Sequence, residues 1–182
     1  MLKRFTVSNF KNFKDEISLD FSKIGEYSFN AGCLSMRLIY GRNATGKTNF
    51  GRALLNIKSL LCGMQSRGLI NADSQEDTAK FIYEFQFGSD EVTYKYSRFA
   101  NTELCDEELY INGEAIFKFD FKNSKFGFQG LSIIGAETVN TNRYLNKDEM
   151  DNEYVLPFLR WLINNTAFSD DSVLIQLGLT SN

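Results

Sequence analysis

Residues 41–48 read Gly41-Arg42-Asn43-Ala44-Thr45-Gly46-Lys47-Thr48, which matches the phosphate-loop pattern G-x-x-x-x-G-K-[ST] at every fixed position. In this pattern the glycines let the backbone curl, so that successive N–H groups point inward at phosphate oxygens. The lysine can then reach the outer phosphates, and the threonine hydroxyl can ligate Mg²⁺. A helix that follows the loop adds the positive end of its dipole to the same anion site. The motif therefore predicts a nucleotide-phosphate site within a strand–loop–helix unit.

The flanking residues have the context that the motif requires. Residues 34–40 are predicted to form a strand that runs into the loop, and residues 49–61 carry apolar side chains at helical spacing. Upstream, residues 2–10 and 16–21 alternate between apolar and polar side chains, which predicts a two-stranded hairpin. We therefore treat residues 1–62 as one unit of hairpin, phosphate loop and helix.

The middle of the chain changes to an apolar period of two. Four segments between residues 80 and 121 are predicted to form an antiparallel meander, and Asn112-Gly113 is a strong hairpin-turn signal. Residues 122–182 read as mixed or helical segments, with an apolar stripe over 154–164. The expected fold class is mixed α/β, a phosphate-loop strand and helix packed with a largely antiparallel sheet. Residues 1–182 are long enough for one such domain.

Composition excludes several classes of chemistry. The chain has no histidine, and Cys33, Cys62 and Cys105 form no C-x-x-C pair, so the usual zinc sites and imidazole-dependent triads are excluded. We expect three reduced thiols in a cytoplasmic protein. No signal peptide or membrane-spanning stretch is visible, so we expect no membrane partner. The net charge of −3 is not that of a generic polyanion binder.

At this point the sequence resembles a known group. Residues 2–13, then an amphipathic strand, then residues 38–49 are similar to the start of an SMC/RecF-like AAA ATPase. This is the ABC-type head that recombination and repair ATPases, OLD-family proteins and many bacterial anti-phage ATPases share. In that group a strand end of type N-F-[RK]-x-F, here Asn9 to Phe13, is followed by a loop of type G-x-N-x-[ST]-G-K-[ST]. The resemblance is strong over residues 1–62, extends to the meander and is loose over residues 122–182. It implies the N-terminal lobe of an ABC/SMC-type ATPase head.

The resemblance implies ATP and Mg²⁺ as cofactors. The nucleotide-binding residues would be Gly41, Arg42, Asn43, Ala44, Thr45, Gly46, Lys47, Thr48 and Asn49. Lys47 is the candidate catalytic residue and Thr48 the candidate Mg²⁺ ligand. Gln129 is the candidate for the Mg²⁺- and water-sensing glutamine of the family, although its flanking residues are atypical.

Two interpretations remain open for the strand end at residues 9–11, and two for Arg42. Asn9, Phe10 and Lys11 sit where the family often contacts the nucleotide, or they form an ordinary strand end with a solvated lysine. Arg42 either touches the γ-phosphate side or a partner subunit, or it faces solvent.

The second half of the chain departs from the family. The family completes its site with a signature serine motif and with an Asp-Glu pair that follows an apolar strand (Walker B). Here residues 173–177 are apolar but lead to Gly178 with no acidic pair. Asp106-Glu107-Glu108 and Asp148-Glu149 lack a preceding buried strand, so both are predicted to be solvated charge clusters. Hydrolysis therefore has no visible general base or second Mg²⁺ carboxylate in this chain.

These features leave three functional hypotheses and one expectation about the chain. The first is an ATP-binding lobe that needs a C-terminal half-head or a second ATPase head, for example in a homodimer, for hydrolysis. The second is a non-enzymatic, nucleotide-gated interaction module or a truncated remnant that docks on a C-terminal partner. The third is DNA contact through lysines and arginines of the sheet, which the resemblance implies for many relatives and the net charge of −3 disfavours. We expect an N-terminal half-head, either a truncated reading frame, a shortened fragment or one part of a split protein.

Overall fold

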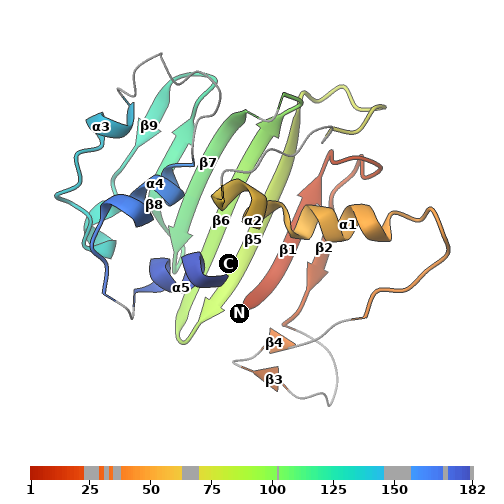
Figure 1. Cartoon of the computed structure of the whole chain (residues 1–182), viewed down its shortest axis with the longest axis horizontal. Coiled ribbons are helices and arrows are strands. Elements are labelled where there is room, and N and C mark those ends of the chain that lie inside the picture. The colour runs from red at the N-terminus through yellow and green to blue at the C-terminus, as the bar shows by residue number, and fades with distance from the viewer. Residues whose placement is uncertain are drawn as a thin grey trace.

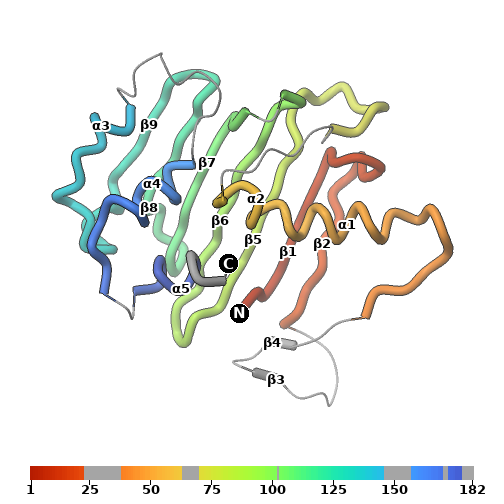
Figure 2. The backbone as a smooth tube through the Cα atoms, in the orientation of Figure 1, coloured from red at the N-terminus to blue at the C-terminus, as the bar shows by residue number. Residues whose placement is uncertain are grey.

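The computed structural model describes residues 1–22, 29–30, 33–34, 38–62, 70–101, 103–145, 157–169 and 172–180. A twisted antiparallel sheet forms one layer, and the helices form a second layer on one of its faces (Figures 1 and 2). Mixed α/β architecture with a largely antiparallel sheet is therefore confirmed. In the described part of the chain, no helix is both long and apolar enough to cross a membrane.

The main sheet has seven strands in the order β2-β1-β5-β6-β7-β8-β9. Every neighbouring pair is antiparallel. Its strands are β1 (Leu2–Ser8), β2 (Ile17–Asp20), β5 (Thr78–Phe87), β6 (Asp90–Phe99), β7 (Leu104–Ile111), β8 (Glu114–Asp120) and β9 (Lys125–Gly127). The predicted hairpin and the predicted four-stranded meander are both present, whereas β9 is an addition that the sequence did not indicate.

The turn between β7 and β8 shows why Asn-Gly is such a strong signal. Asn112 and Gly113 both have positive φ, 51° and 82°. That pair of left-handed residues matches the twist of the two strands that it joins.

Along the chain, two helices precede β5, and the remaining described helices follow β9. They are α1 (Lys47–Leu54), α2 (Asn56–Leu61), the 3₁₀ helix η1 (Leu131–Ile134), α3 (Asn142–Leu145), α4 (Phe158–Asn165) and α5 (Val173–Thr180). The helix predicted over residues 49–61 is present as two helices that meet at Leu55. At this junction the Tyr83 hydroxyl bonds to both the Ala53 carbonyl and the Ile57 N–H group. The apolar run at residues 173–177 is helical, so it is not the strand that a Walker B motif requires.

Aromatic side chains form most of the core between the sheet and the helices. On β5, alternation buries Phe81, Tyr83 and Phe85 on the face that the helices cover. Farther along the sheet, Phe119 and Phe158 form a second cluster with ring centroids 4.6 Å apart. The aromatic content of the sequence is thus used to join the two layers.

The strand predicted over residues 34–40 is wrong for its described C-terminal part. Leu34 belongs to a separate two-stranded ribbon of β3 (Phe29–Asn30) and β4 (Cys33–Leu34). Leu38, Ile39 and Tyr40 are not in a strand and are 81%, 48% and 87% exposed. Strand propensity alone does not hold a segment extended, because its backbone needs a neighbouring strand to bond with. Residues 35–37 lie outside the described part of the chain.

Candidate functional site

The phosphate-loop residues project from the sheet on the side of β1 and β2 and lead into α1 (Figure 1). Helix α1 is anchored across two strands by its inward side chains. The Phe50 ring packs edge-to-face on Phe5 of β1 with a centroid separation of 5.6 Å. On β5, the Tyr83 hydroxyl donates to the Ala53 carbonyl at 2.9 Å. The sheet therefore fixes α1 while leaving its N-terminal end and residues 41–45 at the surface.

Residues with positive and negative φ alternate along the backbone of the loop. Ala44 and Gly46 have positive φ, 65° and 93°, with Thr45 between them. Alternation of this kind turns successive N–H groups to the same side and makes a concave anion site. The Thr45 hydroxyl donates to the Arg42 carbonyl at 2.9 Å and closes the loop on itself.

The ammonium group of Lys47 lies over the loop. It donates to the carbonyl oxygens of Gly41 at 2.7 Å and Arg42 at 2.6 Å. These two acceptors are uncharged, so phosphate oxygens can replace them with a gain in electrostatic attraction. Within the described part of the chain, no ion pair with a carboxylate holds Lys47.

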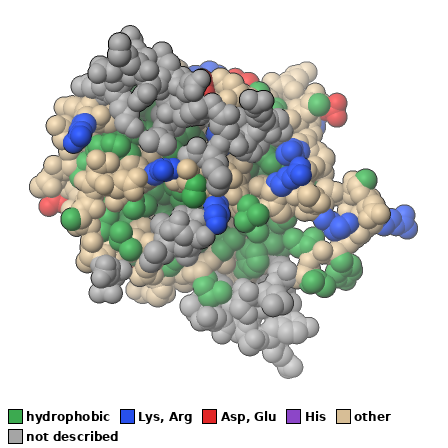
Figure 3. Space-filling model, in the orientation of Figure 1, with side chains coloured by type: hydrophobic (Ala, Val, Ile, Leu, Met, Phe, Trp, Pro, Cys, Tyr) green, Lys and Arg blue, Asp and Glu red, His purple; other side chains and the backbone are tan. Residues whose placement is uncertain are grey.

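The stretch of sequence on both sides of the loop has basic but no acidic residues. Residues 27–72 contain no Asp or Glu, but they do contain Arg37, Arg42, Lys47, Arg52, Lys58 and Arg67. Arg42 and Arg52 are exposed. Figure 3 shows lysine and arginine side chains gathered where the loop and α1 lie, on the right of the helix-covered face. This local charge favours an anion even though the whole chain is acidic.

Thr48 and Asn49 occupy the first turn of α1. Thr48 is exposed, so its hydroxyl is available to a ligand at the loop. Asn49 donates from Nδ2 to the Oδ1 of Asn12 at 2.7 Å. Helix α1 thus contacts the turn after β1 through a pair of side-chain amides.

In the turn after β1, the candidate residues Asn9 and Phe10 have structural roles. Asn9 is buried, and its Nδ2 donates to the carbonyls of Glu76 and Thr78 at 3.0 and 2.8 Å. The ring of Phe10 is buried against Phe81. The Lys11 ammonium lies 5.8 Å from the centre of the Phe10 ring.

In this turn, Asn12 contacts Gly46 and Asn49. The ring of Phe13 lies edge-to-face with Phe50, with centroids 6.3 Å apart. Asn12 lies between the two strands predicted over residues 2–10 and 16–21, and the sequence pattern predicts no role for its side chain. The signal that could have found it is its place inside the N-F-[RK]-x-F segment, one residue before the second phenylalanine.

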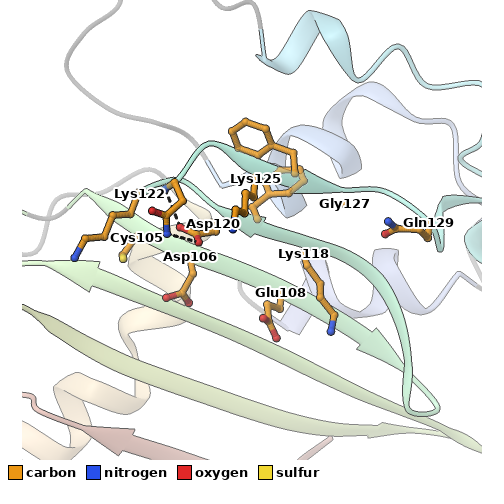
Figure 4. A pocket seen from close by; sticks show the side chains of 12 residues that line it. Cys105, Asp106, Glu108, Lys118, Asp120, Lys122, Lys125, Gly127 and Gln129 are labelled. Atoms are coloured by element: carbon orange, nitrogen blue, oxygen red, sulfur yellow. Dashed lines mark hydrogen bonds between the residues drawn. The ribbon is translucent and has the colours of Figure 1, made fainter.

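Gln129 is not brought to the loop. It follows β9 at the far edge of the sheet, whereas α1 packs on β1 and β5. A depression of about 580 Å³ lies over β7, β8 and β9, and Gln129 is one of its lining residues. Figure 4 shows Gln129 at one end of the lining side chains. The lining of this depression mixes acidic and basic side chains, among them Asp106, Glu108, Lys118 and Lys125.

The predicted solvated cluster at Asp106-Glu107-Glu108 is wrong for Glu107, which is fully buried. On β7, Glu107 shares the helix-covered face with Leu109 and Ile111. Its carboxylate accepts from the Tyr94 hydroxyl at 2.9 Å and from the N–H groups of Phe158 and Leu159 at 2.7 and 2.9 Å. Burial raises the pKa of Glu107 to about 7, against the opposing effect of these donors.

Glu107 therefore caps a helix that lacks a cap of its own. Pro157 stands at the N-cap of α4 and makes no side-chain capping bond, so the carboxylate of β7 takes the first N–H groups instead. This role is structural and does not involve the loop. The other predicted cluster, Asp148-Glu149, lies outside the described residues.

No protein-family model matches this chain. No curated protein matches it either.

Proposed function

We propose that this chain binds Mg-ATP through residues 41–48, as the ATP-binding lobe of an SMC/RecF-like ATPase. The observation that carries the proposal is the loop itself: left-handed residues at Ala44 and Gly46, with the Lys47 ammonium resting on two loop carbonyls at the start of α1. A backbone of this shape presents N–H groups to an anion. The resemblance of residues 1–62 to SMC/RecF-like ATPases is the reason for proposing ATP as the nucleotide.

The donor set fits a nucleotide with Mg²⁺. The N–H groups at the start of α1 would hold phosphate oxygens, and Lys47 would exchange its carbonyl partners for the outer phosphates. The Thr48 hydroxyl would be the one protein ligand of Mg²⁺, an ion that usually keeps several waters and phosphate oxygens. When bound, Mg²⁺ neutralises phosphate charge. Arg42 is exposed and would lie beside the outer phosphates or a partner.

For hydrolysis, the proposed function requires a carboxylate from outside the described residues. The apolar run 173–177 forms helix α5, and Glu107 is committed to the N-terminus of α4. We propose that a C-terminal half-head or a second ATPase head, such as one from a homodimer, supplies the missing general base.

A specific observation favours the alternative, a nucleotide-gated interaction module without enzymatic activity. Leu38, Ile39 and Tyr40 form an exposed apolar segment directly before the loop. Apolar side chains gathered at the surface mark docking sites more often than isolated ones do. ATP turnover by the purified chain well above that of Lys47→Ala would contradict this alternative.

DNA contact through the sheet is not supported as a function. Four basic side chains of the sheet and its adjoining loop are paired with acidic ones: Lys3 with Glu91, Arg4 with Asp20 and Glu84, Lys80 with Glu76, and Lys122 with Asp77. Such a surface releases few counterions on binding a polyanion.

The proposal is tested by calorimetric titration of the chain and of Lys47→Ala with Mg-ATP. Loss of the charge-assisted bonds should weaken binding by about tenfold or more. Lys125→Ala, which removes an exposed cation from β9 at the far edge of the sheet, is the matched control and should bind as the wild type does. Equal affinities of wild type and Lys47→Ala would contradict the proposal.

A further inference from the structure

The turn at residues 9–13 is held in an uncommon backbone conformation. Asn9 and Lys11 have φ of 52° and 53° although neither is glycine, and residues with a Cβ seldom adopt this region. Reciprocal backbone bonds of 2.8 Å between Phe10 and Phe13 close the turn. Such conformations persist where the surroundings over-determine them, and they cluster at functional sites.

The segment before β5 supplies those surroundings. Asn71 donates from Nδ2 to the Lys11 carbonyl and from its backbone N–H to the Asn9 carbonyl. The buried amide of Asn9 donates back to Glu76 and Thr78. The turn is thus bonded on both sides, and the residue at its tip, Asn12, is held in a defined place.

Asn12 points at the phosphate loop. Its Oδ1 accepts from Asn49 in the first turn of α1. Its Nδ2 lies against the α-carbon of Gly46, because a Cβ built there would come within 2.3 Å of that atom and 3.0 Å of the Phe13 ring. One exposed side chain therefore contacts both the last glycine of the loop and the helix that follows it.

We propose that Asn12 is a positioning residue of the nucleotide site, an inference that rests on the function proposed above. It acts through Gly46 and Asn49 and does not touch the nucleotide. By covering Gly46 it fixes the left-handed residue of the loop, and by accepting from Asn49 it orients the first turn of α1. The N–H groups at the start of α1 then face the phosphates before the nucleotide arrives, which lowers the ordering cost of binding.

The test compares Mg-ATP affinity of the wild type, Asn12→Ala, Asn49→Ala and the double variant. Each single substitution should weaken binding about fivefold, the value expected for one lost hydrogen bond. The double variant should be no weaker than Asn12→Ala, because Asn12→Ala already removes the bond that Asn49→Ala removes. Asn123→Ala is the matched control, since Asn123 is another exposed turn asparagine whose amide donates to a side chain, that of Asp120, at 2.7 Å.

Thermal unfolding separates positioning from folding. Asn12→Ala should keep the unfolding midpoint of Asn123→Ala while losing affinity. Wild-type affinity in Asn12→Ala, effects that multiply in the double variant, or a loss of affinity matched by a lowered midpoint would each overturn the inference. If the wild type itself does not bind Mg-ATP, the proposed function fails and this inference fails with it. If Lys47→Ala alone loses binding, only the role of Asn12 is refuted.

Discussion

At the scale of single residues, Glu107 has the clearest physical consequence outside the loop. Its carboxylate is fully buried and accepts three hydrogen bonds, one from Tyr94 and two from the start of α4. The titratable groups that face it are Tyr94 on β6, Tyr144 on α3 and its neighbour Asp106. The pKa of Glu107 is raised from 4.5 to about 7, mainly by burial. The folded chain therefore binds a proton that the unfolded chain releases near pH 4.5.

This difference predicts that the chain becomes more stable as the pH falls from 8 to 5.5. A raised carboxyl pKa gives stability that is fully present below the unfolded pKa and is lost as the pH rises through the folded one. The free energy of unfolding should increase by about 2 kcal/mol over this range. Urea denaturation at several pH values measures it.

Glu107→Gln is the control for that measurement, because an amide does not titrate. The variant should keep only the smaller pH dependence of stability that comes from Asp106, because burial raises the pKa of that carboxyl as well. Asp20 acts in the opposite sense but at lower pH, because Ser22 and Arg4 hold its pKa below the ordinary value. Identical pH dependence in wild type and Glu107→Gln would refute the assignment.

Residues differ in how far the sequence could predict their roles. The position of Lys47 and Thr48 at the start of a helix could be predicted, because a loop motif is local in sequence; their roles in binding remain a proposal. The role of Glu107 could not be predicted, because its partners at residues 158 and 159 are more than fifty positions away. Glu107 lies two residues before Leu109 on β7, so the alternation places both on one face of the strand. A charged side chain at such a position is nevertheless expected to be solvated, and this expectation is wrong here. Asn12 was missed because its contact with Gly46 is tertiary.

At the scale of elements, the junction of α1 and α2 is bonded to the sheet by two tyrosines. The Tyr96 hydroxyl donates to the Oδ1 of buried Asn56 at 2.8 Å. The Tyr83 hydroxyl donates to the Ala53 carbonyl and accepts from the N–H of Ile57 at 3.2 Å. The break at Leu55 thus lies between two bonded turns, which hold the junction of α1 and α2 over β5 and β6.

Tyr96→Phe should therefore lower the free energy of unfolding by about 1–3 kcal/mol, the usual cost of leaving a buried polar group unsatisfied. The ring itself should stay stacked on Phe81, at a centroid distance of 4.9 Å. Tyr110→Phe is the matched control, because its hydroxyl bonds to Glu108 in a partly exposed position. Equal destabilisation of the two variants in urea would contradict the account.

The elements themselves were predictable where their pairing is local. The β1–β2 hairpin and the meander follow from alternation and from turn residues such as Asn112-Gly113. The strand expected before the loop was not formed at residues 38–40, because local propensity cannot supply a neighbouring strand. The split of the helix at Leu55 depends on bonds to Tyr83 and Tyr96, which no local pattern reveals.

At the scale of the whole molecule, the two ends of the sheet differ in what they offer. The phosphate loop projects beside β1 and β2, and the mixed-charge depression with Gln129 lies over β7, β8 and β9 (Figures 1 and 4). The proposed nucleotide site therefore uses one end of the sheet alone. Its remaining walls and the hydrolytic carboxylate would come from a partner on the exposed side of the loop.

The most direct measurement of the central claim is a backbone amide NMR titration of the chain with Mg-ATP. The account predicts that the largest shift changes fall on residues 41–49, with smaller ones at Asn12, and that Gln129 and β9 stay unchanged. Shift changes confined to the depression over β7–β9, or none in residues 41–49 at millimolar Mg-ATP, would contradict it.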